Sequence, residues 1–223
     1  LYGCDVSTVA LKYAKEFGSG KVTYKKIKGK KLPFKDNYFD ACVALDVIEH
    51  VSDIDFFLKE VRRVLKKDGL FFSHTPTEGQ PLTHTWFWSK IRLGSKMTFR
   101  RYGHVHPELT HSQIQDKLKR GGFMIIKKNY SEHIIFQFLS ILIYFIPLEI
   151  LELILKNKAD LYKDKGIMIS RSKKKSENKY IIYFRNLWIH LSYLARLLTY
   201  WELELFKFFW IGALKINILA IKR

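Results

Sequence analysis

The sequence predicts an α/β protein whose core is a mostly parallel sheet with helices on both faces. Over residues 1–132, short strand-like runs alternate with amphipathic helical runs, the pattern of parallel strands joined by crossover helices. From 133 to 212 the chain turns to long apolar and aromatic runs around a basic stretch, and residues 213–223 return to strand character. We therefore expect a Rossmann-like core over 1–132, a helical insertion over 133–212, and a closing strand over 213–223 that rejoins the core sheet.

The first elements of the core are marked by apolar runs and by a capping residue. Leu1–Cys4 has the character of a buried strand and ends on the carboxylate of Asp5, after which Ser7 is placed to cap an amphipathic helix. Lys21–Ile27 alternates weakly, which favours a second strand. Phe39–Asp46, "FDACVALD", is a continuous apolar run flanked by acids, as expected of a strand that is buried on both faces.

The second half of the core continues this alternation. Apolar residues at 54, 57, 58, 61, 64 and 65 have the period of a helix, and Gly69 is expected to end that helix. The following runs predict a strand, a short helix and another strand, over residues 69–76, 112–120 and 122–130.

Composition and charge limit the possible functions. Hydrophobic residues make up 48% of the chain, which excludes a disordered protein and provides a substantial core. Cys4 and Cys42 lie in apolar strand-like runs, so we expect free thiols in a reducing compartment. The net charge of +18 is spread over the whole chain and suits an anionic partner, either nucleic acid or the acidic face of a membrane.

Four stretches, taken together, carry a family resemblance. They are "GCDVS", "LPFKDNYFDACVALDVIEHV", "LKEVRRVLKKDGLFFSHTP" and "RYGHVHPELTHSQIQDKLKRGGF". In this order and spacing they resemble the class I S-adenosylmethionine-dependent methyltransferases, most closely the small-molecule and lipid branch that includes quinone methyltransferases. The resemblance covers roughly residues 1–130 and the closing strand.

The resemblance implies S-adenosylmethionine as cofactor and assigns residues to it. Asp5 would hold the ribose hydroxyls and Val6 would pack on the adenine. Leu32 would contribute from the loop after the second strand, and Leu45 with Asp46 would line the methionine moiety. Position 28, where the family often has an acid, is a lysine. The family's first strand and its Gly-rich turn have no counterpart in the sequence, so we expect a sequence that starts at the family's second strand and lacks part of the cofactor site.

Methyl transfer to oxygen also needs a base, for which histidine is the best candidate because imidazole titrates near neutrality. We assign this role to His50 with Glu49 beside it, and His104 is an alternative site residue. His74 and His106 are further alternates. A metal site is not expected, because neighbours such as Glu49 and His50 do not point to the same face of a helix.

The apolar insertion predicts helices that lie in a membrane interface. Its longest uncharged stretch, residues 134–148, has 15 residues and is shorter than the ~20 needed to cross a bilayer. Polar residues recur along one helical face at His133, Gln137, Ser140 and Tyr144. Because the closing strand rejoins the core sheet, the chain would cross a membrane twice or not at all. Two crossings would place the basic stretch 156–179 on the side away from the cytoplasm, against the positive-inside tendency. The alternative is a helical cap whose apolar faces pack together.

From these observations we expect a cytoplasmic methyltransferase on the inner membrane face, acting at an oxygen of a lipid-like or lipid-linked small molecule. One alternative is a nucleic-acid methyltransferase or binder, which is disfavoured because no nucleic-acid-binding motif is present. Another is a methyltransferase-like scaffold without catalysis. The sequence does not indicate the acceptor, the atom that is methylated or the oligomeric state.

Overall fold

The computed structural model describes residues 1–18, 20–86, 103–133, 137, 139, 200, 204, 206–209 and 211–223. The chain divides into two compact units. Unit 1 consists of Leu1–Thr77, Val105–Asn129 and Lys215–Arg223, and unit 2 of Glu78–His104 and Tyr130–Leu214. The predicted interfacial helices fall almost entirely outside the described residues, so they stay a prediction, as do the domain boundaries at 132 and 212.

Unit 1 begins with a small parallel sheet. Its strands, β1 (Tyr2–Asp5) and β2 (Thr23–Lys26), are joined by the helix α1 (Thr8–Phe17). The predicted cap is confirmed, since the Ser7 hydroxyl accepts a hydrogen bond of 3.2 Å from the amide of Ala10. The Tyr2 ring meets three aromatic rings edge-on, with centroid distances of 5.6 to 5.7 Å, from Phe34, Tyr38 and Phe39.

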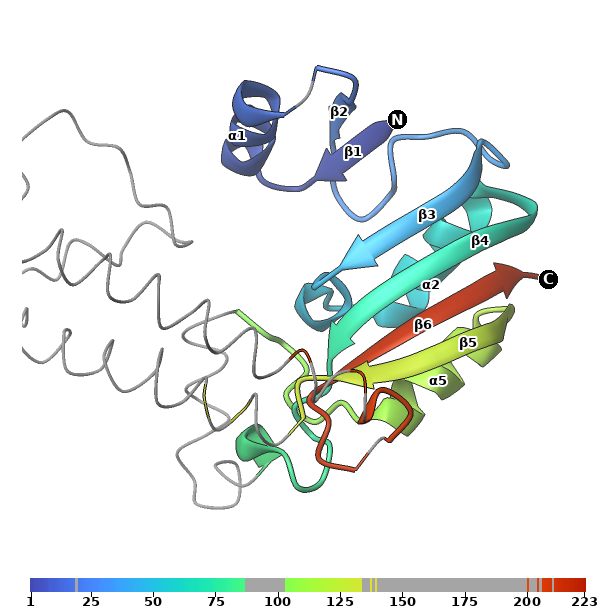
Figure 1. The fold of residues 1–223 in the computed structure, drawn as a ribbon. Coiled ribbons are helices and arrows are strands. Elements are labelled where there is room, and N and C mark those ends of the chain that lie inside the picture. The colour runs from blue at the N-terminus through green and yellow to red at the C-terminus, as the bar shows by residue number, and fades with distance from the viewer. Residues whose placement is uncertain are drawn as a thin grey trace, which may run out of the picture. The chain divides into compact units, whose positions relative to one another are not determined.

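The larger sheet of unit 1 has four strands in the order β3-β4-β6-β5 (Figure 1). These are β3 (Phe39–Leu45), β4 (Leu65–Pro76), β5 (Phe123–Ser131) and β6 (Lys215–Lys222). β3 and β4 are parallel, whereas the closing strand β6 is antiparallel to β4. The mixed α/β architecture and the return of the chain end to the sheet agree with the prediction.

The structure differs from the expected single sheet in one respect. β1 pairs with β2, and β3 pairs with β4, but among the described residues no strand joins β1 to β3. Backbone pairing needs strands about 4.8 Å apart. One edge of β1 and one edge of β3 therefore have no strand partner within the described part of the chain.

The core of unit 1 lies between the four-stranded sheet and two helices on one of its faces, α2 (Ile54–Val64) and α5 (His111–Arg120) (Figure 1). The predicted helical period of α2 is confirmed, because the buried side chains follow it. Asp53 caps α2, and Thr110 forms a capping box at the start of α5. The most completely buried apolar side chains of this core are Leu58, Val64, Leu65, Phe71, Ile114, Leu118, Ile216, Ile218 and Ala220.

The predicted end of α2 at Gly69 is wrong. The helix ends at Val64, and Leu65 already pairs with Phe39 as the first residue of β4. Gly69 instead lies within β4, where an added Cβ would come within 2.9 Å of the carbonyl oxygen of Lys66. The glycine is needed for a close backbone approach, and pairing with β3 determines where the helix stops.

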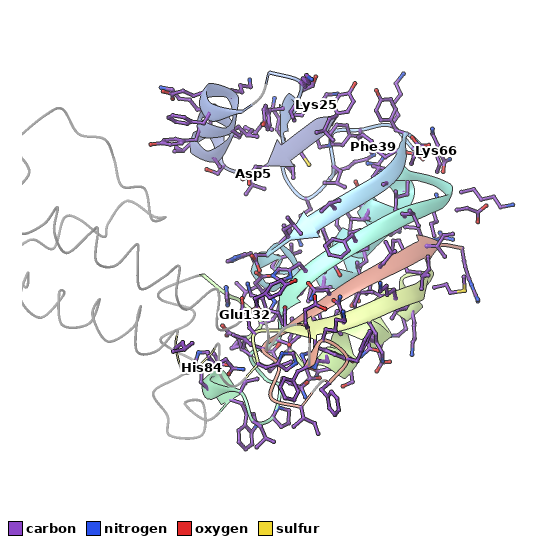
Figure 2. The ribbon with its side chains drawn as sticks, in the orientation of Figure 1. Asp5, Lys25, Phe39, Lys66, His84 and Glu132 are labelled. Atoms are coloured by element: carbon purple, nitrogen blue, oxygen red, sulfur yellow. The ribbon has the colours of Figure 1, made fainter. Side chains whose placement is uncertain are left out.

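The described part of unit 2 contains a buried polar network. The side-chain amide of Gln137 donates to the carbonyl oxygens of Glu132 (2.7 Å) and Gly212 (2.5 Å), and its oxygen accepts from the amide of His84 (2.8 Å). The amide of Leu214 donates to the Glu132 carbonyl at 3.1 Å. Figure 2 labels His84 and Glu132 in this region. Among the described residues, no helix is long and apolar enough to cross a membrane.

Candidate active site

The predicted cofactor residues of unit 1 lie where its parallel strands end. Asp5 is the last residue of β1, and Leu45 with Asp46 closes β3. In Figure 2, Asp5 lies at the carboxyl end of β1, whereas Phe39 and Lys66 lie at the opposite, amino-terminal end of β3 and β4. Ligands of open α/β sheets bind at the carboxyl ends of strands, which makes this edge the candidate site.

Asp5 has one carboxylate oxygen that is already used. Its Oδ1 accepts a hydrogen bond of 2.6 Å from the amide of Ser7, which orients the carboxylate at the start of α1. Its Oδ2 has no recorded partner among the described residues and remains able to accept from a ligand hydroxyl. The adjacent Val6 side chain is exposed, so it is open to contact with a flat apolar ring. A carboxylate beside an exposed aliphatic group fits the ribose and base of an adenosine.

The loop that carries Leu32 is held by an ion pair whose carboxylate is buried and whose arginine is partly buried. Glu60 and Arg63 of α2 bond to each other at 2.8 Å, and Arg63 also donates to the carbonyl oxygens of Leu32 (3.0 Å) and Phe34 (2.8 Å). The Leu32 amide donates to Glu60 at 2.8 Å. The hydrogen bond from Arg63 is the main reason why the pKa of Glu60 lies below its ordinary value. Sequence reasoning missed this pair, which fixes both sides of Leu32.

Lys28 is exposed and lies in a short bridge with Lys31 around Gly29, whose φ is +71°. Its ammonium group is a donor and cannot accept a hydrogen bond from an adenine amino group. Lys28 therefore cannot replace the acid that the family often has at this position.

Asp46 has a positive φ of 50° and lies among charged and polar groups. Its Oδ1 is 3.3 Å from the Nζ of Lys215 and 3.7 Å from the Nε2 of His74. The Nδ1 of His74 hydrogen-bonds the side-chain oxygen of Asn217. His74 is thus held between β4 and β6 at the carboxyl end of β4, beside a predicted cofactor residue.

Glu49 and His50 lie together in the short helix η1 (Ile48–His50), directly after β3. The Glu49 side chain is buried, whereas that of His50 is 41% exposed, and 3.8 Å separates the Nε2 of His50 from the nearer Glu49 oxygen. This distance is too long for a hydrogen bond. The structure therefore brings the two predicted residues together without fixing the imidazole by that carboxylate.

The other histidines have different surroundings. The Nε2 of His106 donates to the carbonyl oxygen of Val51 at 2.9 Å, which ties the segment before α5 to the end of η1. His104 belongs to unit 2, where its Nδ1 lies 2.7 Å from the Oε1 of Glu78. Glu78 was missed from the sequence, because nothing local connects it with a histidine 26 residues away.

Comparisons with known proteins indicate a methyltransferase domain. Residues 1–73 match the family model described as "Methyltransferase domain". The ubiquinone biosynthesis O-methyltransferase of Pelagibacter ubique is 42% identical over 55 residues, which are 25% of this chain and 22% of that protein. The 2-phytyl-1,4-naphtoquinone methyltransferase of Trichormus variabilis is 32% identical over 129 residues, 51% of this chain and 55% of that protein. The chain thus spans about half of one relative and a quarter or less of the other.

A solved structure extends the likeness to the fold. The S-adenosylmethionine-dependent methyltransferase of Mesorhizobium loti matches with a TM-score of 0.51 and 14% identity, over 99% of this chain and 79% of that one. The matched family segment contains Asp5, Leu32, Leu45 and Asp46, and its strands end at the candidate site. The matched segment and the fold are thus those of a methyltransferase domain, as the sequence predicts.

Proposed function

We propose that this protein transfers the methyl group of S-adenosylmethionine to a hydroxyl oxygen of a quinol-like, lipid-linked acceptor, at the inner face of a membrane. The observation that carries the proposal is the Asp5 carboxylate at the end of β1, oriented by Ser7 and with a second oxygen that bonds no other residue in the described part of the chain. The named relatives support the acceptor class, since two quinone-pathway methyltransferases are among them.

In this proposal the cofactor lies along the carboxyl ends of β1 and β3. Asp5 accepts hydrogen bonds from the ribose hydroxyls, Val6 contacts the adenine, and Leu32 lies beside it on the loop that Arg63 holds. Leu45 and Asp46 line the methionine moiety. The bound cofactor supplies an electrophilic methyl group, so the protein's main task is to align it with the acceptor oxygen.

The acceptor hydroxyl must lose its proton during transfer. His50 with Glu49, and His104 of unit 2, are the proposed residues for this step, and imidazole is suited to it near neutral pH. His106 is less suited because its Nε2 is already engaged by Val51.

Membrane association rests on the charge and on the composition of the insertion. The basic stretch 156–179 has nine basic and three acidic residues, and each Lys or Arg near an anionic surface adds about 1 kcal/mol of attraction. The apolar runs on either side would add burial that salt does not screen.

The cofactor assignment is tested by titration calorimetry with S-adenosylmethionine. In the full-length protein, Asp5→Ala should weaken binding by the loss of one or two hydrogen bonds to a charged group, about 1.5–3 kcal/mol each. Asp55→Ala is the matched control, because Asp55 pairs with Lys117 on the exposed side of α2. Equal affinities of the Asp5 variant and the control would remove Asp5 from the site.

The acceptor and membrane assignments are tested with labelled methyl groups and with vesicles. A catechol with a prenyl tail should be methylated on oxygen faster than the same catechol without the tail. Binding to vesicles that contain phosphatidylglycerol should have a salt-sensitive part and a salt-resistant part. Charge reversal at Lys173, Lys174 and Lys175 should remove the salt-sensitive part of the binding. Replacing Phe136, Leu139 and Ile143 by serine should remove the salt-resistant part. Binding to RNA but not to vesicles would favour the nucleic-acid alternative instead.

A further inference from the structure

The described part of unit 2 contains a carboxylate–imidazole pair shielded from solvent. The Nδ1 of His104 lies 2.7 Å from the Oε1 of Glu78, and the two side chains are 13% and 8% exposed. This distance is that of a strong, charge-assisted hydrogen bond. His104 was a candidate site residue from the sequence, but its partner was not.

The backbone around Glu78 is held by a set of short-range hydrogen bonds. Glu78 follows β4 after a single residue, Thr77. The carbonyl oxygen of Glu78 accepts from the hydroxyl of Thr85 at 3.1 Å, and the hydroxyl of Thr83 donates to the carbonyl of Gln80 at 2.8 Å. Thr83 and Gln80 are buried. These hydrogen bonds therefore fix the main chain that bears the Glu78 side chain.

Glu78 is bonded differently from the structural carboxylate of unit 1. Both oxygens of the buried Glu60 accept hydrogen bonds, from Arg63 and from the Leu32 amide. By contrast, the Oε2 of Glu78 is buried and has no hydrogen-bond partner among the described residues. A buried carboxylate with one unsatisfied oxygen costs stability. Among the described residues, the hydrogen bond that the Glu78 carboxylate makes is the one to His104.

We infer that Glu78 is a positioning residue that fixes the tautomer of His104. A carboxylate can only accept, so the hydrogen bond places a proton on the Nδ1 of His104 and the lone pair on Nε2. This tautomer is the one that can take a proton through Nε2. By comparison, the Nε2 of His50 lies 3.8 Å from the nearer oxygen of Glu49, which is too long for a hydrogen bond.

The inference rests on the proposed function, in which an acceptor hydroxyl is methylated. In that function the hydroxyl proton would pass to the Nε2 of His104, an oxygen lone pair would form the new O–C bond, and the C–S bond of S-adenosylmethionine would break. The sulfur keeps the electron pair of that bond. The imidazolium, stabilised by the carboxylate of Glu78, then releases its proton to solvent, which restores the starting state.

The tautomer can be measured without any acceptor, by two-bond ¹H–¹⁵N correlation spectra of the whole chain with ¹⁵N-labelled histidine. His104→Gln identifies the signal. In the wild-type protein His104 should show a protonated Nδ1 and an unprotonated Nε2, and Glu78→Leu should convert it to a mixture of tautomers. Glu78→Gln keeps an acceptor oxygen and should keep the tautomer. A protonated Nε2 and unprotonated Nδ1 in the wild-type protein would overturn the inference, whatever the variants do.

Kinetics then connect the tautomer with the reaction. With the prenylated catechol as probe, Glu78→Leu should lower kcat by about tenfold or more, with the KM values for cofactor and catechol within about twofold, and Glu78→Gln should recover most of the loss. Glu108→Gln is the matched control, since Glu108 makes a similar 3.2 Å contact with the Nδ1 of His106 at an exposed position. An unchanged kcat in Glu78→Leu, or an equal loss in the control, would refute the positioning role. If no catechol is methylated while the tautomers behave as expected, the proposed function fails and the assignment of Glu78 stands.

Discussion

Replacing Arg63 by alanine would test how the Leu32 loop is attached to α2. Arg63 makes five hydrogen bonds, to Glu60 through both oxygens, to Asp36, and to the carbonyls of Leu32 and Phe34. The bond to Asp36 contributes little, about 0–1 kcal/mol, because Asp36 is exposed. Glu60 is 7% exposed and Arg63 is 18% exposed, so removing Arg63 should cost about 3 kcal/mol, the low end of the range for a buried pair.

The loss can be followed by urea unfolding with far-UV circular dichroism. With a slope of about 2 kcal/mol per molar urea, a loss of about 3 kcal/mol lowers the midpoint by about 1.5 M. Hydrogen exchange at the Leu32 amide, which donates to Glu60, should accelerate as well. Arg62→Ala is the control, since the neighbouring Arg62 is exposed and bonds the carbonyl of Arg223. Equal midpoints for the two variants would refute the reasoning.

The same pair sets a pH dependence with a definite sign. The pKa of Glu60 is lowered from its ordinary 4.5, first by the hydrogen bond from Arg63. Its contribution to the free energy of unfolding is therefore complete above pH 4.5 and is lost as the pH falls through the lower pKa of the folded protein. The urea midpoints of wild type and Arg63→Ala should converge in acid. A constant difference down to pH 2 would contradict this.

Three further predictions concern other parts of unit 1. Burial raises the pKa of Cys42 to about 11. Iodoacetamide at pH 7.5 should therefore modify the exposed Cys4 faster than Cys42. Equal modification rates of the two cysteines, followed by mass spectrometry, would contradict this. Thr110→Ala should lower the free energy of unfolding by about 1 kcal/mol through loss of the capping box, whereas Ser52→Ala should leave it unchanged in the same urea assay. Val43 is 65% exposed on β3, a strand with an unpaired edge in the described part of the chain. Val43→Lys should therefore reduce self-association, as measured by sedimentation velocity. An unchanged self-association would argue against edge pairing.

The parts of the fold that could be predicted are those decided locally. Ser7 caps α1 because a side chain three residues from a free amide can reach it, and the apolar period of α2 needs no knowledge of distant strands. Gly69 was misassigned because the end of α2 depends on the pairing of Leu65 with Phe39, far away in the sequence. Local pattern cannot reveal that competition.

The residues of the candidate site likewise divide into those that the local sequence indicates and those that only the folded chain brings together. Asp5 and Asp46 could be proposed as site residues from the sequence because they end apolar runs, and strand ends form the binding edge of such sheets. Glu60, Glu78 and Asn217 could not be found, because each acts through a partner that only the folded chain brings near. The residues that would touch the ligand were thus easier to predict than those that orient them.

The bonds around Gln137 have a consequence for engineering. Gln137 bonds the carbonyls of Glu132 and Gly212, and Leu214 bonds Glu132 directly, so the chain leaves and re-enters the core at adjacent points. A loop closed at its base costs little more when it is lengthened, since the closure entropy grows only with the logarithm of length. We therefore expect that the segment between Glu132 and Leu214 can be exchanged for others. Inserts of other lengths, or a short turn between Glu132 and Leu214, should leave the β4–β6 pairing in place.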